Sequence, residues 1–336
     1  MQLLRSVLIR LGTTAITLIG VAVIVFFVIR VVPGNPIAMM LQPGATEADV
    51  ARLTALYGLD KSIPQQFLIW VSGVLQGDFG TSITTKQPVL ALILSRLPAT
   101  LELSIMALVI AVAIGGGMAL TGTRLRGTKT EAVIDVSNGM ALSVPDFLWG
   151  LFLILIFGVL VPVFHISGRV TPSLQLPFST NFYLFESVFR LRFDLWLDIV
   201  SHMFMPALAL AIPLAAIIGQ LLKQSLKETM HLDYVTLART KGYSENHVIL
   251  REALPNAILP TLTLVGVQFT FLIGGTVIIE RLFSYEGLGN MAIDAVINRD
   301  LPLIQGIVIL FAVIFTAVNL VVDLCYAALN PRLRHA

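Results

Sequence analysis

Four carboxylic acids lie in or near long apolar stretches of this chain, where an ionisable side chain is a candidate for chemistry. They are Glu102, Asp135, Asp146 and Asp323. A charge inside a bilayer is costly, so such a residue usually faces water or a partner group. Acids of this kind can relay protons, and two aspartates that meet can cleave peptides. The sequence alone pairs none of the four, and hydrogen bonding within the helix framework is their more ordinary role.

Three polar or helix-breaking residues are candidates for a transport pathway: Pro145, Asp146 and Gln268. Asp146 is the strongest of them because it directly follows a proline, where backbone groups are freed. Glu102 and Asp135, by contrast, are expected near helix ends. Asn319 and Asp323 lie four residues apart on one helical face, so we expect them to bond another helix.

Signatures of an enzyme are weak. The stretch from Gly122 to Thr130 resembles a phosphate-binding loop, but one extra residue separates its second glycine from the lysine and no strand precedes it. We therefore predict no ATP hydrolysis and no catalytic residue. His202 stands beside Met203 and Met205, which are sequence neighbours and not a convergent ligand shell, so we predict a satisfied histidine at a helix end and no metal site.

Composition places the chain in a membrane. Of its 336 residues, 56% are hydrophobic and 12% are charged, whereas a soluble domain has about a quarter of its residues charged. The mean hydropathy is +0.87. A net charge of +2 without a basic stripe argues against nucleic acid as a partner. The single cysteine, Cys325, excludes an intrachain disulfide.

Apolar segments predict an all-α protein with about six transmembrane helices, each of about 20 residues. The expected spans are Leu11–Ile29, Ala99–Leu120, Val133–Val161, His202–Leu222, Ile258–Ile279 and Leu303–Leu324. Prolines interrupt the fourth and fifth, which a membrane helix tolerates where neighbours or water satisfy the freed carbonyl.

Lysine and arginine predict the orientation, because short cytoplasmic loops retain positive charge. One side holds the dense basic groups: Arg5, Arg10, the loop from Arg124 to Lys129, the loop from Lys223 to Arg251, Arg332 and Arg334. The other side spreads its basic residues through longer loops that also contain acids. Both termini are therefore expected in the cytoplasm.

The long first external loop carries signals for two short helices. Thr46 can cap one that ends at Gly58, and a second is expected after Pro64 and before Gly77, with Phe67, Leu68 and Leu75 on its apolar face. These helices would cover the outer mouth of the protein or dock a partner.

The most informative loop runs from Asp233 to Pro260. A short helix is expected from Tyr234 to Lys241, Gly242 should break it, and Ser244 should open another in which Val248, Ile249 and Ala253 face inward. Two amphipathic helices that meet at a glycine can seat in a cleft of a soluble partner. On physics alone, an interfacial helix bound to anionic lipid is an equal reading.

This loop resembles the EAA loop of bacterial ATP-binding-cassette (ABC) importer permeases, in the form found in the dipeptide, oligopeptide and nickel subfamily. The matching residues are Asp233, Tyr234, Ala238, Arg239, Lys241, Gly242, Leu254, Pro255 and Asn256. The chain departs from the wider family at Thr236, Leu237 and Glu252. Further similar motifs are Gly77–Ser82, Pro98–Leu103, Ser143–Pro145, Phe283–Gly289, Asn319 with Asp323, and Asn330–Arg332.

The resemblance implies a type I importer permease in a bacterial inner membrane. Its parts would be a peripheral helix (residues 1–30), an external loop (31–97), a five-helix core (98–330, with the coupling loop at about 223–257) and a cytoplasmic tail (331–336). Implied partners are a second homologous permease, two ATPase subunits that carry ATP and Mg²⁺, an extracytoplasmic substrate-binding protein, and lipid. The chain itself would bind no cofactor.

Two questions stay open at the level of sequence. The cargo could be short peptides, nickel, glutathione or another small solute, since permeases for all of these share the motifs. An ion-gradient-driven transporter that uses the intramembrane acids is the alternative of a different class. An intramembrane protease is remote, because no HExxH, GxSxG or paired aspartate motif occurs.

Overall fold

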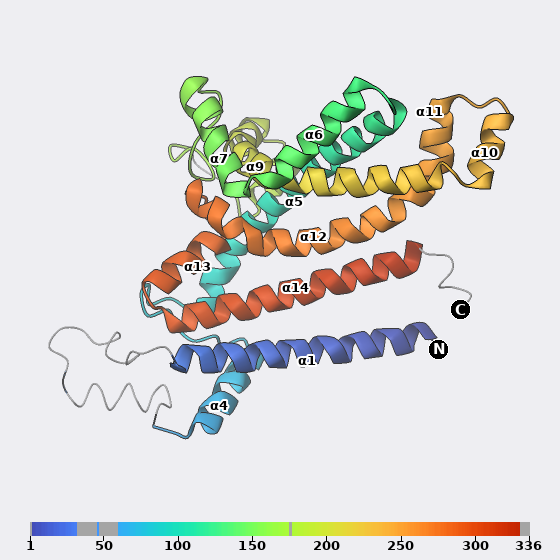
Figure 1. Cartoon of the computed structure of the whole chain (residues 1–336). Coiled ribbons are helices and arrows are strands. Elements are labelled where there is room, and N and C mark those ends of the chain that lie inside the picture. The colour runs from blue at the N-terminus through green and yellow to red at the C-terminus, as the bar shows by residue number, and fades with distance from the viewer. Residues whose placement is uncertain (1, 32–45, 47–59, 175–176, 330–336) are drawn as a thin grey trace. The chain divides into compact units, whose positions relative to one another are not determined.

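The computed structural model describes residues 2–31, 46, 60–174 and 177–329, and the regular elements among them are helices (Figure 1). In chain order they are α1 (Gln2–Val31), α4 (Ile63–Leu75), α5 (Val89–Arg124), α6 (Lys129–Ser143), α7 (Asp146–Leu153), the π-helix η1 (Ile154–Leu160), α8 (Tyr183–Phe189), α9 (Phe193–Thr229), α10 (Asp233–Thr240), α11 (Glu245–His247), the π-helix η2 (Val248–Ala253), α12 (Leu254–Leu282), α13 (Leu288–Ile297) and α14 (Leu301–Leu329). The only pairing of extended residues in this part of the chain is an isolated bridge between Thr81 and Pro88. The predicted all-α class is confirmed.

Within the described residues, four helical stretches are long and apolar enough to cross a membrane: Val89–Arg124, Phe193–Thr229, Glu245–Leu282 and Leu301–Val322. The pair α6 and α7 with η1 makes a fifth if it is counted as one bent span. The first predicted span lies within α1, whose described apolar stretch, Gly12–Phe27, is shorter than those four. Helix α9 has 37 residues, about 55 Å at 1.5 Å per residue, so it extends beyond a 30 Å hydrocarbon core.

The third predicted span is broken, which corrects the expectation of one helix over Val133–Val161. Helices α6 and α7 meet at an angle of 104°. The break lies at Val144, whose φ of −108° and ψ of 125° are extended. Pro145 explains this conformation, because its ring disfavours a helical backbone in the preceding residue. Pro206 and Pro213, by contrast, lie inside the continuous α9.

Helix α5 begins at Val89 and includes Pro98, earlier than the predicted start at Ala99. Glu102 therefore lies within the helix, and the prediction that it is near a helix end is wrong. His202 likewise lies inside α9, which begins at Phe193, so the expectation of a helix-end histidine is also wrong. In both cases the helix begins before the predicted span: at Val89, ten residues before Ala99, and at Phe193, nine residues before His202.

The chain divides into two compact units, one of Met1–Leu97 with Met291–Thr316 and the other of Pro98–Asn290 with Ala317–Ala336. In the first unit, Phe26 of α1 is fully buried and packs edge-on against Phe67 of α4, with ring centroids 5.1 Å apart. The predicted helix after Pro64 is confirmed as α4, although Leu68 and Leu75 on its expected apolar face are exposed. The helix expected between Thr46 and Gly58 falls outside the described residues.

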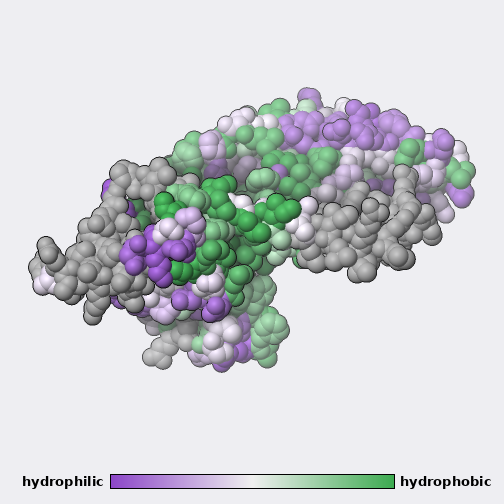
Figure 2. Space-filling view, turned by 90° about the horizontal axis from the view of Figure 1, so that it is seen from below, coloured by the Kyte–Doolittle hydropathy of each residue, from purple (hydrophilic) through white to green (hydrophobic). Residues whose placement is uncertain are grey.

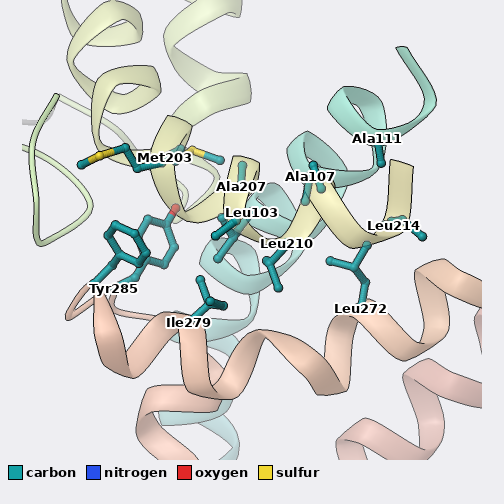
Figure 3. Close-up of a cluster of buried hydrophobic side chains, with 14 of the residues drawn as sticks. Leu103, Ala107, Ala111, Met203, Ala207, Leu210, Leu214, Leu272, Ile279 and Tyr285 are labelled. Atoms are coloured by element: carbon teal, nitrogen blue, oxygen red, sulfur yellow. The ribbon is translucent and has the colours of Figure 1, made fainter. Parts of the chain in front are cut away.

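In the second unit, α5, α9 and α12 enclose a core of small and aliphatic side chains (Figure 3). Leu103 and Ala107 of α5 meet Ala207 and Leu210 of α9 in this cluster. The two helices cross closely at Gly115 and Gly219, where a Cβ built on Gly219 would lie 3.0 Å from the carbonyl oxygen of Gly115. Apolar side chains are as well solvated by lipid tails as by one another, so membrane helices are held together largely by such close packing.

The surface carries many large apolar side chains. Ile16, Val109, Phe271 and Ile278 are each more than half exposed, and the face seen in Figure 2 shows continuous apolar areas. A water-soluble monomer rarely exposes patches of this extent. Lipid is therefore the solvent for much of this surface.

Candidate coupling segment and buried polar networks

Residues 233–253, which comprise α10, the turn at Gly242, α11 and η2, project beyond the ends of α9 and α12 (Figure 1). We call them the α10–η2 segment. Its helices pack on one another and on α9 through a cluster of fully or nearly fully buried side chains: Leu222, Leu226, Val235, Ala238, Val248, Ile249 and Ala253. The predicted inward face of Val248, Ile249 and Ala253 is confirmed. The segment therefore has a small core of its own.

The turn between α10 and α11 depends on Gly242. Its φ of 82° is in the left-handed region, which glycine enters without steric cost. Ser244 then caps α11, because its hydroxyl accepts a hydrogen bond from the backbone N–H of His247. The predicted sequence of helix, glycine break and capped helix is confirmed in detail.

Arg239 of α10 bonds both to α11 and to the residue that follows α9. Its Nη2 donates to Glu245 Oε1 at 2.8 Å, and its Nη1 donates to the carbonyl oxygen of Met230 at 3.3 Å. The hydrogen bond to Glu245 raises the pKa of Arg239. Because both side chains are substantially exposed, this ion pair orients the turn more than it stabilises the fold.

The outer face of the segment is both apolar and basic. Leu237, Tyr243 and Leu250 are about half exposed, and Lys241 and Arg251 are exposed beside them. The buried positions hold the segment together, so these outer side chains are free to meet another surface. Such a rigid projection with a mixed face suits docking in a groove of a soluble protein.

A side-chain hydrogen bond connects α10 to α12. The amide Nδ2 of Asn256 donates to the hydroxyl oxygen of Tyr234 at 2.8 Å. Leu254 and Pro255 form the first turn of α12, where proline is tolerated because the first N–H groups of a helix lack partners in any case. Asp233 similarly occupies the first turn of α10, where a negative charge is favourable. Among the residues predicted for coupling, the structure thus brings Tyr234 and Asn256 together.

The three pathway candidates do not form one cluster among the described contacts. Pro145 and Asp146 lie at the break between α6 and α7, and Asp146 accepts a hydrogen bond from the N–H of the adjacent Phe147 at 2.8 Å. Gln268 lies in the middle of α12 and is partly buried. Helix α7 approaches α12 further along, where Gly150 faces Ile279 and Leu282.

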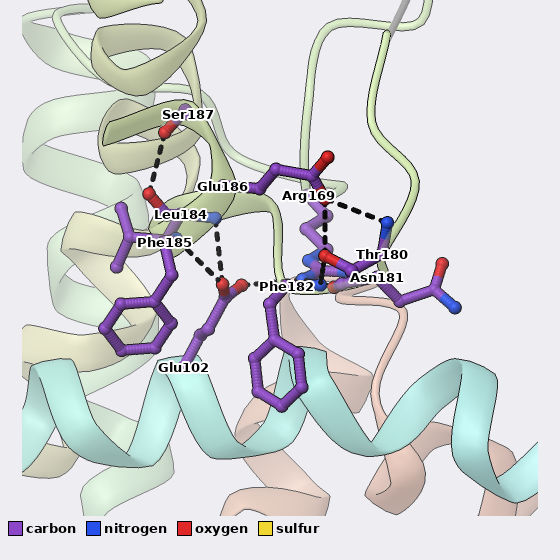
Figure 4. A network of polar contacts seen from close by, with 9 residues as sticks. All are labelled: Glu102, Arg169, Thr180, Asn181, Phe182, Leu184, Phe185, Glu186 and Ser187. Carbon is purple, nitrogen blue, oxygen red and sulfur yellow. Dashed lines mark hydrogen bonds and ion pairs between the residues drawn. The ribbon is translucent and has the colours of Figure 1, made fainter. Parts of the chain in front are cut away.

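Glu102 has a partner that sequence reasoning missed (Figure 4). Its Oε2 accepts from Arg169 Nη2 at 2.6 Å, and its Oε1 accepts from the N–H of Leu184 at 2.8 Å. Both charged side chains are buried, and the Arg169 guanidinium lies over the Tyr183 ring, 3.9 Å from its centroid. Glu102 of α5 thereby holds the connection between η1 and α8, in which Arg169 lies 67 residues further along the chain.

A second buried acid, Glu280, also escaped notice. Its carboxylate accepts from Thr100 Oγ1 at 2.7 Å and from the N–H of Asn290 at 3.0 Å. A Cβ at Gly287 or Gly289 would meet this carboxylate. The available signal was an acid at the end of an apolar helix followed by two closely spaced glycines.

The other intramembrane acids have structural partners or are not described. Lys223 of α9 lies between Asp135 and Glu131 of α6, with Nζ–O distances of 2.7 and 2.8 Å. The preference for structural bonding is thus confirmed for Glu102 and Asp135. The side chain of Asp323 lies outside the described residues.

The fold defines a class: a polytopic helical membrane protein in which a compact segment projects beyond the long helices. Residues 111–335 match the family described as binding-protein-dependent transport system inner membrane component, and residues 3–104 match the N-terminal part described for the same systems. The chain belongs to this family. It is a multi-pass inner-membrane permease component of an ABC importer.

Similar curated proteins cover nearly the whole chain. It is 37% identical to the dipeptide transport system permease protein DppB of Escherichia coli K12 over 99% of both chains. It is 31% identical to the oligopeptide permease protein AppB of Bacillus subtilis, over 95% of both, and 34% identical to the glutathione permease protein GsiC of Salmonella typhi, over 99% of this chain and 100% of that one.

Solved structures agree on the fold. An inward-facing form of the MetNI methionine ABC transporter aligns with a TM-score of 0.55 at 13% identity, over 71% of this chain and 96% of that chain. A second crystal form of the same transporter aligns with a TM-score of 0.53. The predicted type I importer permease fold is confirmed.

Proposed function

We propose that this permease forms half of a pathway for short peptides, and that the α10–η2 segment couples it to partner ATPase subunits. The observation that carries this proposal is the construction of the segment: a buried core of its own, an exposed apolar and basic face, and a hydrogen bond that the Asn256 side chain of α12 donates to the Tyr234 hydroxyl. A partner that moves the segment would thereby move a membrane helix. A lipid-bound interfacial helix would need no such core.

The proposed assembly contains a second homologous permease, two ATPase subunits and an extracytoplasmic substrate-binding protein. ATP and Mg²⁺ bind the ATPases, and both termini of this chain lie in the cytoplasm with the α10–η2 segment. The distribution of basic residues supports this orientation. Pro145, Asp146 and Gln268 are proposed to line the pathway. Pro145 and Asp146 lie where α6 and α7 meet at 104°, and such a bend within an apolar span supports this placement.

Short peptides lead as cargo because similar proteins are named for dipeptide, di/tripeptide and oligopeptide transport. Other similar proteins are named for transport of glutathione, so this tripeptide is the alternative cargo. Cargo choice is proposed to reside mainly in the external binding protein.

The test is ATP-dependent uptake of a labelled dipeptide into proteoliposomes that contain this chain with its candidate partner subunits. Ala238→Asp places a charge in the buried core of the segment, and Gly242→Pro is incompatible with φ of 82°. Gly127→Pro is the matched control, because Gly127 has φ of 79° in the turn between α5 and α6. Co-purification of the ATPase subunits is measured alongside uptake.

We expect both segment variants to reach the membrane but to lose ATPase co-purification and uptake, while Gly127→Pro retains ATPase binding. Uptake that persists without any ATPase would instead establish the gradient-driven alternative. Unlabelled glutathione and Ni²⁺ serve as competitors, and competition by either one stronger than by dipeptides would replace the proposed cargo.

A further inference from the structure

His165, Asp198 and His202 come together in the second unit, away from the α10–η2 segment. One possible ligand atom from each of the three lies within 4.8 Å of the others. Asp198 and His202 are one turn apart on α9, and His165 comes from the connection that follows η1. The two imidazole rings are parallel within 6°, with centroids 3.9 Å apart. Neither the proposed coupling nor the pathway uses these residues.

Hydrogen bonds settle which ring nitrogens carry protons. His202 Nδ1 lies 2.9 Å from the carbonyl oxygen of Asp198, which can only accept, so Nδ1 is the donor. Ser201 Oγ donates its single proton to the same carbonyl at 2.7 Å. His165 Nδ1, 2.8 Å from Ser201 Oγ, must therefore donate to that hydroxyl. In the neutral form of each ring, Nε2 is therefore the nitrogen that carries no proton.

This tautomer is the one that a metal ligand needs. A histidine that binds a metal through one nitrogen usually donates its other N–H to a backbone carbonyl or another oxygen, which fixes the ring. The carboxylate of Asp198 is fixed as well, because Oδ2 accepts from the Thr171 N–H at 2.9 Å and Oδ1 from the Thr171 hydroxyl at 2.6 Å. In the structure, hydrogen bonds thus hold all three side chains, one of them to the Asp198 backbone itself.

We propose that His165, Asp198 and His202 bind one borderline divalent cation of the Zn²⁺ class. Two imidazoles and one carboxylate are a donor set that Zn²⁺ accepts, with a fourth position left for water. The carboxylate also compensates part of the cation's charge. His202 is buried and holds its position, whereas His165 is exposed. Binding requires the His165 ring to leave the parallel stack and its hydrogen bond to Ser201, so that its lone pair points at the ion.

Local sequence does not reveal this site, because the near neighbours of His202 in the chain are Met203 and Met205. In the structure, His202 instead stacks on His165, which lies in the connection between η1 and α8. A bound cation would connect the loop that holds His165 to α9. The site thereby differs in kind from the peptide pathway.

The test is equilibrium dialysis of the purified full-length chain against Zn²⁺ with a competing chelator, using an affinity tag without histidine. His165→Ala removes an exposed ligand without disturbing the core, and His202→Ala removes the buried one. His231→Ala is the control, because His231 is exposed and lies between α9 and α10. Thr171→Val removes one hydrogen bond to the Asp198 carboxylate and leaves all three ligands.

We expect one Zn²⁺ per chain, an affinity at least tenfold weaker in His165→Ala and His202→Ala, and no change in His231→Ala. Thr171→Val should weaken binding about tenfold, as loss of an outer hydrogen bond to a ligand does. A visible Co²⁺ spectrum that disappears in His165→Ala would support the same ligands. Equal affinity in the wild type and in a folded His165→Ala variant overturns the proposal.

Discussion

The Tyr234 hydroxyl of α10 accepts a hydrogen bond from the Asn256 side chain of α12, with oxygen and nitrogen 2.8 Å apart. The two residues are 22 positions apart, and most of the α10–η2 segment lies between them in the chain. This bond gives the segment a direct side-chain connection to a long apolar helix. Its removal is therefore a sensitive test of mechanical coupling.

Tyr234→Phe and Asn256→Ala should each lower ATP-dependent uptake about fivefold, since an intramolecular hydrogen bond contributes about 1 kcal/mol. The double variant should be no worse than the more affected single variant, because both remove one interaction. Uptake rates in proteoliposomes, at equal ATPase occupancy, measure this. Asn246→Ala, at an exposed position on α11, is the control, and additive losses in the double variant would argue against the bond.

Gly115→Ala should destabilise the protein by about 1–3 kcal/mol, because added volume in a close-packed contact forces the backbone apart. A Cβ at Gly115 would lie 3.1 Å from the Gly219 nitrogen and even closer to the Ala215 carbonyl. Gly116→Ala is a matched control with nothing within 4 Å of its new Cβ. Melting temperatures in detergent compare the two, and equal values would show that α5 and α9 do not need this close crossing.

Glu102→Gln should destabilise the protein by about 3–5 kcal/mol, because it leaves the buried Arg169 without a countercharge. Removing both charges with Glu102→Gln and Arg169→Met should restore much of the lost stability. Asp194→Asn breaks the ion pair with Arg192, in which both side chains are exposed, and should have a far smaller effect. A double variant as unstable as Glu102→Gln alone would show that the charge itself is not the cause.

Glu186 should make stability depend on acid pH. Hydrogen bonds from the Thr180 hydroxyl, and then from the N–H groups of Ser179 and Thr180, lower the pKa of Glu186 from its ordinary 4.5 to about 2. A lowered pKa in the folded state stabilises the protein fully above the unfolded pKa, and this contribution is lost as pH falls from about 4.5 to about 2.

Glu186→Gln should accordingly be less stable than the wild type near neutral pH, and the two melting curves should converge as pH falls toward 2. The comparison of differences is needed because other carboxylates also titrate in this range. A constant offset between the two proteins across the whole range would show that ionisation of Glu186 contributes nothing.

Much of the fold follows from local pattern. Runs of apolar residues predicted six helical segments; five lie within continuous helices, and the third is divided between α6 and α7 with η1. Gly242, Ser244 and the spacing of Val248, Ile249 and Ala253 predicted the α10–η2 segment, because a positive φ, a cap and a buried stripe are each encoded within a few residues. Pro145 was visible as well, but hydropathy does not report chain direction, so the 104° break was missed.

The sequence by itself determined that this is a helical membrane protein with a projecting two-helix segment, since lipid burial, helix caps and glycine turns act over short stretches of chain. Only the tertiary structure decided that Arg169 meets Glu102, that Thr100 meets Glu280 and that His165 stacks on His202. These pairs join residues far apart in the chain, and each is selected by which helix faces touch once close packing at small residues has set the helices side by side.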